Sequence, residues 1–92
     1  MPALEQEVLD VIRRIFRTEL EYAGPVERSL DLQRDLHVDS LNAVVLAVGL
    51  EDHFRVRLEA ETTVGVTTVG DLVARVAQRV RASRDAEHGT TA

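Results

Sequence analysis

Residues 36–54 read Leu-His-Val-Asp-Ser-Leu-Asn-Ala-Val-Val-Leu-Ala-Val-Gly-Leu-Glu-Asp-His-Phe, and the architecture of the chain follows from them. On a helical wheel at about 100° per residue, the apolar residues of this stretch form two stripes on opposite faces. One stripe contains Ala43, Leu46, Ala47, Leu50 and Phe54. The other contains Leu41, Val44, Val45 and Val48, followed one turn later by Glu51 and Asp52. A surface helix normally has a single apolar stripe, so the second one predicts either more core or a partner surface.

The start of this helix carries two polar residues, Asp39 and Ser40. Both are residue types that favour the N-cap position, and a helix N-terminus has unpaired backbone N–H groups that attract anions. A serine hydroxyl at this point lies in a field that suits an attached phosphoester. Ser40 is therefore either an ordinary cap or a site of modification.

The rest of the chain predicts further helices around this one. Apolar residues recur with helical spacing from about Ala3 to Leu20. A long connection of residues 25–38 follows, in which Asp31–Leu36 could form a helical turn. The second helix is expected over about Ser40–Phe54, and a short helical turn is expected within Glu59–Val66. Thr68 and Asp71 have the spacing of a capping box that opens a last helix, which we expect to end near Arg81.

These elements predict an all-α fold, a small antiparallel bundle of three main helices and one short helix with a long first loop. We expect one domain over residues 1–81 and a disordered tail over residues 82–92, since the tail lacks apolar periodicity. The linker Arg55–Leu58 alternates polar and apolar residues, with Val56 and Leu58 expected to face inward.

The composition excludes several classes of function. The chain has 92 residues, no cysteine and a net charge of −5. Lack of cysteine removes disulfides and thiolate chemistry, and an acidic chain is a poor ligand for nucleic acid. The longest apolar run, Ala43–Leu50, is too short to cross a bilayer, and the N-terminus lacks the apolar core of a signal peptide. We therefore expect a cytoplasmic protein without membrane insertion.

The motif Asp39-Ser40-Leu41, preceded by Leu36 and followed by an apolar helix ending in Glu51-Asp52-His53-Phe54, resembles that of acyl carrier proteins. Thr67–Leu72 is similar to the start of the last helix in this family, and the resemblance covers about Leu4–Val80. It implies that Ser40 carries a 4′-phosphopantetheine arm, attached from coenzyme A through a phosphodiester, which holds acyl groups as thioesters. It also implies a monomeric carrier with no catalytic residues of its own.

The resemblance also implies partners and the surface that meets them. A phosphopantetheinyl transferase would recognise Asp39 beside Ser40. An acyltransferase, a ketosynthase or other acyl-processing enzymes would bind the helix face formed by Leu41, Val44, Val45, Val48, Glu51 and Asp52. In the family, the acyl chain can also slip between the helices.

The sequence departs from the family at several positions. Asn42 and Val45 stand where fatty-acid carriers often have acidic residues, so recognition should depend more on apolar contact than on charge. His37 stands where the family often has glycine, and the segment after the second helix lacks the common proline. The thinned acidic face and the use of arginine without lysine favour polyketide or another specialised pathway over primary fatty-acid synthesis. The Asp before Ser40 favours an acyl carrier over a peptidyl or aminoacyl carrier.

Alternative interpretations use the same residues. His37, Asp39 and Ser40 lie too close together in one loop to form a hydrolase triad. The Asp31–Asn42 segment fails as a calcium loop, because Leu36 replaces the required glycine, and we expect no metal site. An unmodified helical interaction module, with Ser40 as a mere cap and the Leu41–Val48 face as its docking surface, remains the alternative function. An oligomer built on that face is a further alternative.

Overall fold

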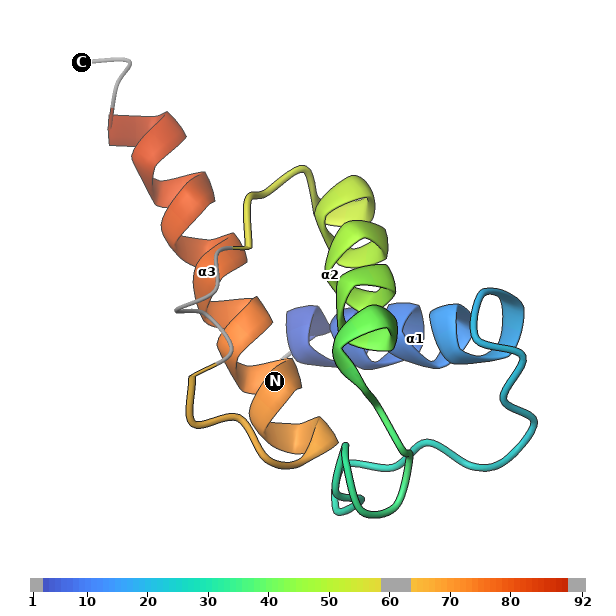
Figure 1. Cartoon of the computed structure of the whole chain (residues 1–92). Helices are drawn as coiled ribbons and strands as arrows, with labels where there is room; N and C mark the ends of the chain where they lie inside the picture. Colours follow the sequence, from blue (N-terminus) through green and yellow to red (C-terminus); the bar gives the residue numbers. More distant parts are fainter. Residues whose placement is uncertain (1–2, 59–63, 90–92) are drawn as a thin grey trace.

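The computed structural model describes residues 3–58 and 64–89, and these form the expected all-α fold (Figure 1). The helices are α1 (Ala3–Thr18), α2 (Ser40–Phe54) and α3 (Val69–Gly89). The described residues contain no β-strand, only an isolated antiparallel bridge between Asp31 and Thr68. The predicted bounds of α2 are confirmed, and α1 ends two residues before the predicted Leu20.

Helix α1 provides the platform on which the other two helices pack. It packs against both α2 and α3, whereas α2 and α3 have little contact with each other. Its buried face consists of Val8, Leu9, Val11, Ile12, Ile15 and Phe16. Leu9 is buried with the others because α1 has neighbours on two sides.

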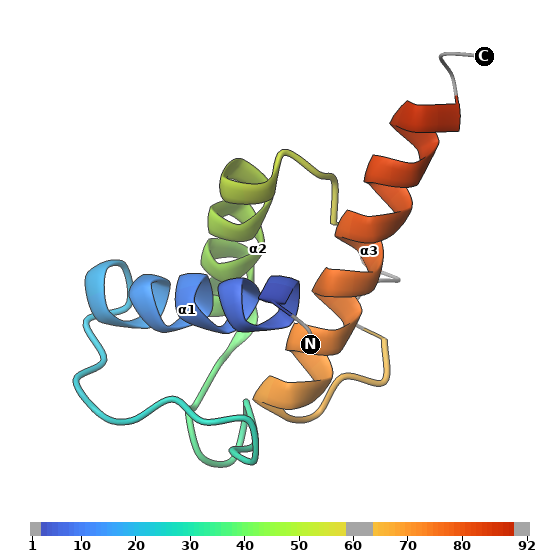
Figure 2. The same cartoon turned by 180° about the vertical axis from the view of Figure 1, so that it is seen from behind.

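The helices are not all antiparallel. Figures 1 and 2 show α2 and α3 running broadly in the same direction while α1 crosses them. The N-termini of α2 and α3 therefore lie at the same end of the molecule.

The long first loop is pinned to the start of α3. Leu32 N donates to Thr67 O over 2.9 Å, and Val69 N donates to Leu30 O over 2.9 Å. The helical turn predicted at Asp31–Leu36 is confirmed, since both Asp35 N and Leu36 N donate to Asp31 O. Backbone N–H groups of Arg34 and Gln33 donate to the Asp31 carboxylate and hold its pKa below the ordinary value. This loop is thus held in place beside the N-terminus of α2.

Helix α3 begins as the capping box predicts and ends later than expected. Asp71 N donates to Thr68 Oγ1 over 3.1 Å, and the Asp71 carboxylate accepts from Thr68 N and Thr67 N. The predicted end near Arg81 is wrong, because the helix continues to Gly89. Residues 82–88 contain neither glycine nor proline, and their alanine, arginine and glutamate have high helix propensity without any apolar period.

The connection between α2 and α3 is described in part. Val56 and Leu58 are half-buried against the core, as predicted. Of the segment predicted to hold a short helix, residues 59–63 lie outside the described residues, and Val64 and Gly65 form a turn. The limits of the carrier domain stay a prediction.

We expect Asp71→Asn to lower the melting temperature at pH 7. The two backbone donors, that of Thr68 first, hold the pKa of Asp71 below its ordinary value of 3.8. A carboxylate with a lowered folded pKa stabilises above the unfolded pKa, and this contribution is lost as the pH falls through the folded value. The difference in melting temperature between wild type and variant, followed by circular dichroism, should therefore narrow between pH 5 and pH 3.

Asp52→Asn is the matched control, because no hydrogen bond of the described residues involves the Asp52 carboxylate. A difference that stays constant down to pH 3 in Asp71→Asn would contradict the expected role of the charge.

Candidate functional site

The N-terminus of α2 assigns different roles to its two polar residues. Asp39 has extended backbone angles, φ −99° and ψ −173°, and its Oδ1 accepts from Asn42 N over 2.8 Å. Asp39 is therefore the N-cap, and Ser40 is the first residue of the helix. The capping role that the sequence left open for Ser40 is filled by its neighbour.

The Ser40 side chain is exposed, and its hydroxyl makes no hydrogen bond to any residue that the structure describes. It stands at the positive end of the α2 dipole, beside the unpaired N–H groups of the first turn. This environment suits a phosphodiester on the Ser40 oxygen, whose negative charge it would stabilise. Among the described residues, neither His37 nor Asp39 is hydrogen-bonded to Ser40.

The residue two positions before the cap has an unusual backbone. His37 has φ 56°, in the left-handed region, which costs a residue with a Cβ about 1 kcal/mol relative to glycine. The turn that delivers Asp39 and Ser40 to the helix requires this conformation. It gives a physical reason why glycine would suit this position.

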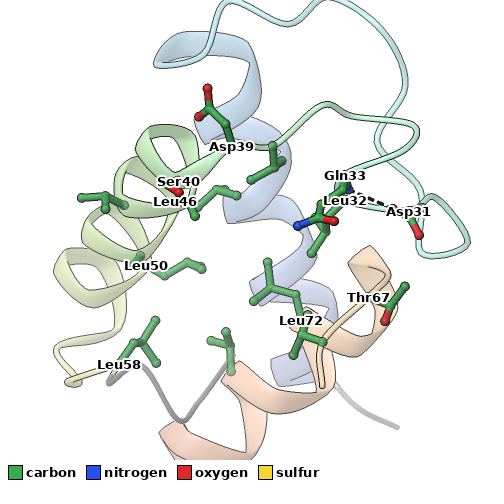
Figure 3. A pocket seen from close by; sticks show the side chains of 16 residues that line it. Asp31, Leu32, Gln33, Asp39, Ser40, Leu46, Leu50, Leu58, Thr67 and Leu72 are labelled. Atoms are coloured by element: carbon green, nitrogen blue, oxygen red, sulfur yellow. Dashed lines mark hydrogen bonds between the residues drawn. The ribbon is translucent and has the colours of Figure 1, made fainter. Parts of the chain in front are cut away.

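A cleft of about 630 Å³ opens beside Ser40, between α2, α3 and the first loop (Figure 3). Its polar lining comes from the residues near the N-termini of α2 and α3, namely Asp31, Gln33, Asp39, Ser40 and Thr67. The rest of its lining is apolar and consists of Leu32, Val38, Ala43, Val44, Leu46, Ala47, Leu50, Leu58, Val66, Leu72 and Val76. The cleft is thus polar at the Ser40 end and apolar beyond it.

The sequence did not identify most of the cleft. Its walls come from residues 31–50, from Leu58 and from residues 66–76, and they meet only through tertiary packing, so no local pattern joins them. The one available signal lay in α2, where Ala43 and Ala47 interrupt a stripe of larger residues. Two small side chains on one helix face leave room beside it.

The outward face of α2 is apolar and exposed. The exposed fraction is 71% for Leu41, 57% for Val44 and 49% for Val48. Val45, which was predicted to lie on the same face, is half-buried and packs against the core. This difference arises because Val45 lies at the edge of the stripe, on the side where α1 packs.

The two acidic residues near the end of α2, Glu51 and Asp52, differ in exposure and in hydrogen bonding. The Glu51 carboxylate accepts from Leu58 N over 2.7 Å, so it holds the chain after α2. Asp52 is exposed. The exposed carboxylates of this face are therefore those of Asp39 and Asp52, one at each end.

Other classes of site find no support in the described part of the chain. No group of three metal-ligating side chains occurs there. No described helix is long and apolar enough to cross a membrane.

Comparison with known proteins points to one family. Residues 10–76 match the family model of the phosphopantetheine attachment site. The chain is 39% identical over 83 residues to acyl carrier protein 3 of Ralstonia nicotianae, covering 87% of this chain and 92% of that protein. A solved structure from Mycobacterium tuberculosis, provisionally named an acyl carrier protein, matches with a TM-score of 0.63 and 32% identity. That match covers 82% of this chain and 96% of the other.

The division of roles at the helix start predicts the stability of variants. Asp39→Ala should lower the free energy of unfolding by about 0.5–2 kcal/mol, because it removes the N-cap. Asp39→Asn should cost less, because asparagine also caps. Ser40→Ala should leave stability nearly unchanged, since no described hydrogen bond is lost. Urea denaturation followed by circular dichroism measures all three, and a larger loss in Ser40→Ala than in Asp39→Ala would contradict the assignment.

Proposed function

This chain belongs to the acyl carrier protein family, and from that membership we propose that Ser40 carries the 4′-phosphopantetheine arm. The observation that carries the proposal is the position of the Ser40 hydroxyl, which is exposed at the rim of the cleft while Asp39 caps the helix. The hydroxyl is thus accessible to a transferase, and its modification would break no hydrogen bond to a described residue. The helix N-terminus favours the phosphodiester that would form there.

Proteins of this family are carriers and not catalysts, and phosphopantetheine is their cofactor. The arm supplies a thiol, which a chain without cysteine lacks. In our proposal the thiol holds acyl intermediates as thioesters for fatty-acid or polyketide biosynthesis. Tethering raises the effective concentration of the acyl group at each partner enzyme and makes recognition depend on the carrier surface.

The cleft is our candidate for the place where the acyl chain rests between transfers. It begins at Ser40, and its volume lies within the range of about 300–1,000 Å³ typical of small-molecule sites. Three buried leucines (Leu46, Leu50 and Leu72) and the buried Val76 line its far part, so an alkyl chain would leave water on entering it.

Carrier proteins act with phosphopantetheinyl transferases and with acyl-processing enzymes. We propose that these partners, an acyltransferase or a ketosynthase among them, bind the exposed face of α2. Leu41 and Val48 are its most suitable anchors, because they are exposed, apolar and outside the cleft. Asp39 and Asp52 supply the remaining charge at its two ends, and Val45 and Glu51 support it from the half-buried side.

The attachment site is tested by intact-protein mass. Incubation with coenzyme A and a broad-specificity phosphopantetheinyl transferase should add one phosphopantetheine to the wild type and none to Ser40→Ala. Circular dichroism of both proteins controls for folding. Absence of any gain on a folded wild type would favour the unmodified interaction module, and a gain on Ser40→Ala would place the attachment elsewhere.

The docking face is tested by the kinetics of the same transfer. Leu41→Ala and Val48→Ala should each lower kcat/KM of the transferase about tenfold, since truncating an apolar anchor costs more than about 1 kcal/mol. Val64→Ala is the matched control, because Val64 is 67% exposed but lies outside α2, and it should change kcat/KM less than twofold.

The apolar character of the outward face of α2 is tested by the salt dependence of the transfer. An increase from 50 to 500 mM NaCl should change kcat/KM of the wild type only a few-fold, because exposed charge pairs contribute little to this contact. A loss much larger than this, or equal effects of Val64→Ala and Val48→Ala, would show that another surface binds the transferase.

A further inference from the structure

We propose that the cargo of this carrier is a fully reduced, unbranched alkyl acyl chain, and that Ala47 is the residue that determines this specificity. The proposal rests on the proposed function, in which Ser40 carries the arm. It goes beyond that function by choosing between classes of cargo. It also differs from the sequence-based expectation of a polyketide cargo, which rested on the thinned acidic face and the use of arginine without lysine.

The distribution of polar groups along the cleft is the first argument. The parallel course of α2 and α3 places both helix N-termini at one end of the cleft (Figure 1). The polar lining lies toward this end, with Asp39 and Ser40 on the α2 side and Asp31, Gln33 and Thr67 across the cleft from them (Figure 3). Toward the end of α2 the walls are Leu46, Leu50, Leu58, Leu72 and Val76. Four of these five, all except Leu58, are buried. A chain attached at Ser40 that enters the cleft therefore passes from polar to apolar surroundings.

The apolar part offers little to a polar chain. Among the residues that the structure describes, the side chains that line this part contain no hydrogen-bond donor. Helices α2 and α3 are regular, so their interior backbone N–H groups are engaged in their own hydrogen bonds. A chain with carbonyl groups along its length would lose water at each of them without gaining a donor, which is costly. A reduced alkyl chain loses no hydrogen bond and gains from leaving water.

The small residues of α2 provide the space. Ala43 and Ala47 line the cleft one turn apart, between Ser40 and Leu50. Ala47 is half-buried, whereas Ala43 is exposed, so Ala47 stands where the cleft becomes enclosed. A larger side chain at residue 47 would project into the cleft, because its neighbours Leu46 and Leu50 already fill the core behind it. Ala47 thus sets the room that is available to the cargo.

The experiment loads the wild type with three acyl-pantetheine groups by means of the transferase and the matching acyl-coenzyme A. The groups are acetyl, octanoyl and 3,5-dioxooctanoyl, the last two having the same number of carbons. Intact mass verifies loading, and circular dichroism gives the melting temperature. We expect octanoyl to raise the melting temperature above that of the acetyl form by about 5 °C or more, and 3,5-dioxooctanoyl to give less than half of that rise.

A pair of variants locates the effect. Ala47→Leu should abolish the rise produced by octanoyl, because the leucine occupies the path of the chain. Ala74→Leu is the matched control, since Ala74 is exposed on α3 and does not line the cleft. It should keep the full rise.

The outcomes separate the two levels of the proposal. A wild type that gains no mass would overturn the proposed function. Successful loading with equal melting temperatures for the octanoyl and dioxooctanoyl forms would leave that function intact and overturn the choice of cargo. Loading with no rise of the melting temperature for the octanoyl form would also overturn the choice of cargo. A full octanoyl rise in Ala47→Leu would overturn the role assigned to Ala47. The comparison of acyl groups on the wild type stands even if Ala47→Leu fails to fold.

Discussion

The packing of α1 against both other helices is the constraint on which the rest of the structure depends. One strongly amphipathic helix buries Val8, Ile12 and Phe16, and both α2 and α3 are anchored to it. Since α2 and α3 contact each other little, the space between them is filled by neither helix, and it becomes the cleft. At one point α2 approaches α1 very closely, where Gly49 leaves room for the Ile15 side chain, because a Cβ at Gly49 would lie 2.6 Å from Ile15 Cδ1.

Hydrogen bonds from backbone N–H groups fix the starts of α2 and α3, which lie beside the cleft. Asp39 closes the start of α2 and Asp71 the start of α3, and the first loop is bonded to the residues before α3. Each carboxylate satisfies backbone donors that would otherwise be unpaired. Ser40, next to the Asp39 cap, is thereby fixed in position although its hydroxyl makes no hydrogen bond to a described residue.

Much of this was predictable from the sequence because it depends on local pattern. The amphipathic spacing predicted α1 and α2, the capping box predicted the start of α3, and the serine motif singled out Ser40. Which of Asp39 and Ser40 caps could not be predicted, since both residue types do so. The end of α3 was missed because propensity, and not apolar periodicity, extends it to Gly89. The cleft and the half-burial of Val45 depend on how distant segments pack, which no local pattern contains.

The two sides of α2 differ in what a substitution would change. The residues that shape the cleft, such as Ala47, and those of the outward face, such as Leu41 and Val48, project from one helix in different directions. In the proposed function, substitutions on the cleft side would alter the cargo while the outward face continues to bind the partner enzymes. Val44 is the exception, because it lines the cleft and is also 57% exposed. In the proposed function, a substitution at Val44 would therefore change the cleft and the partner surface together.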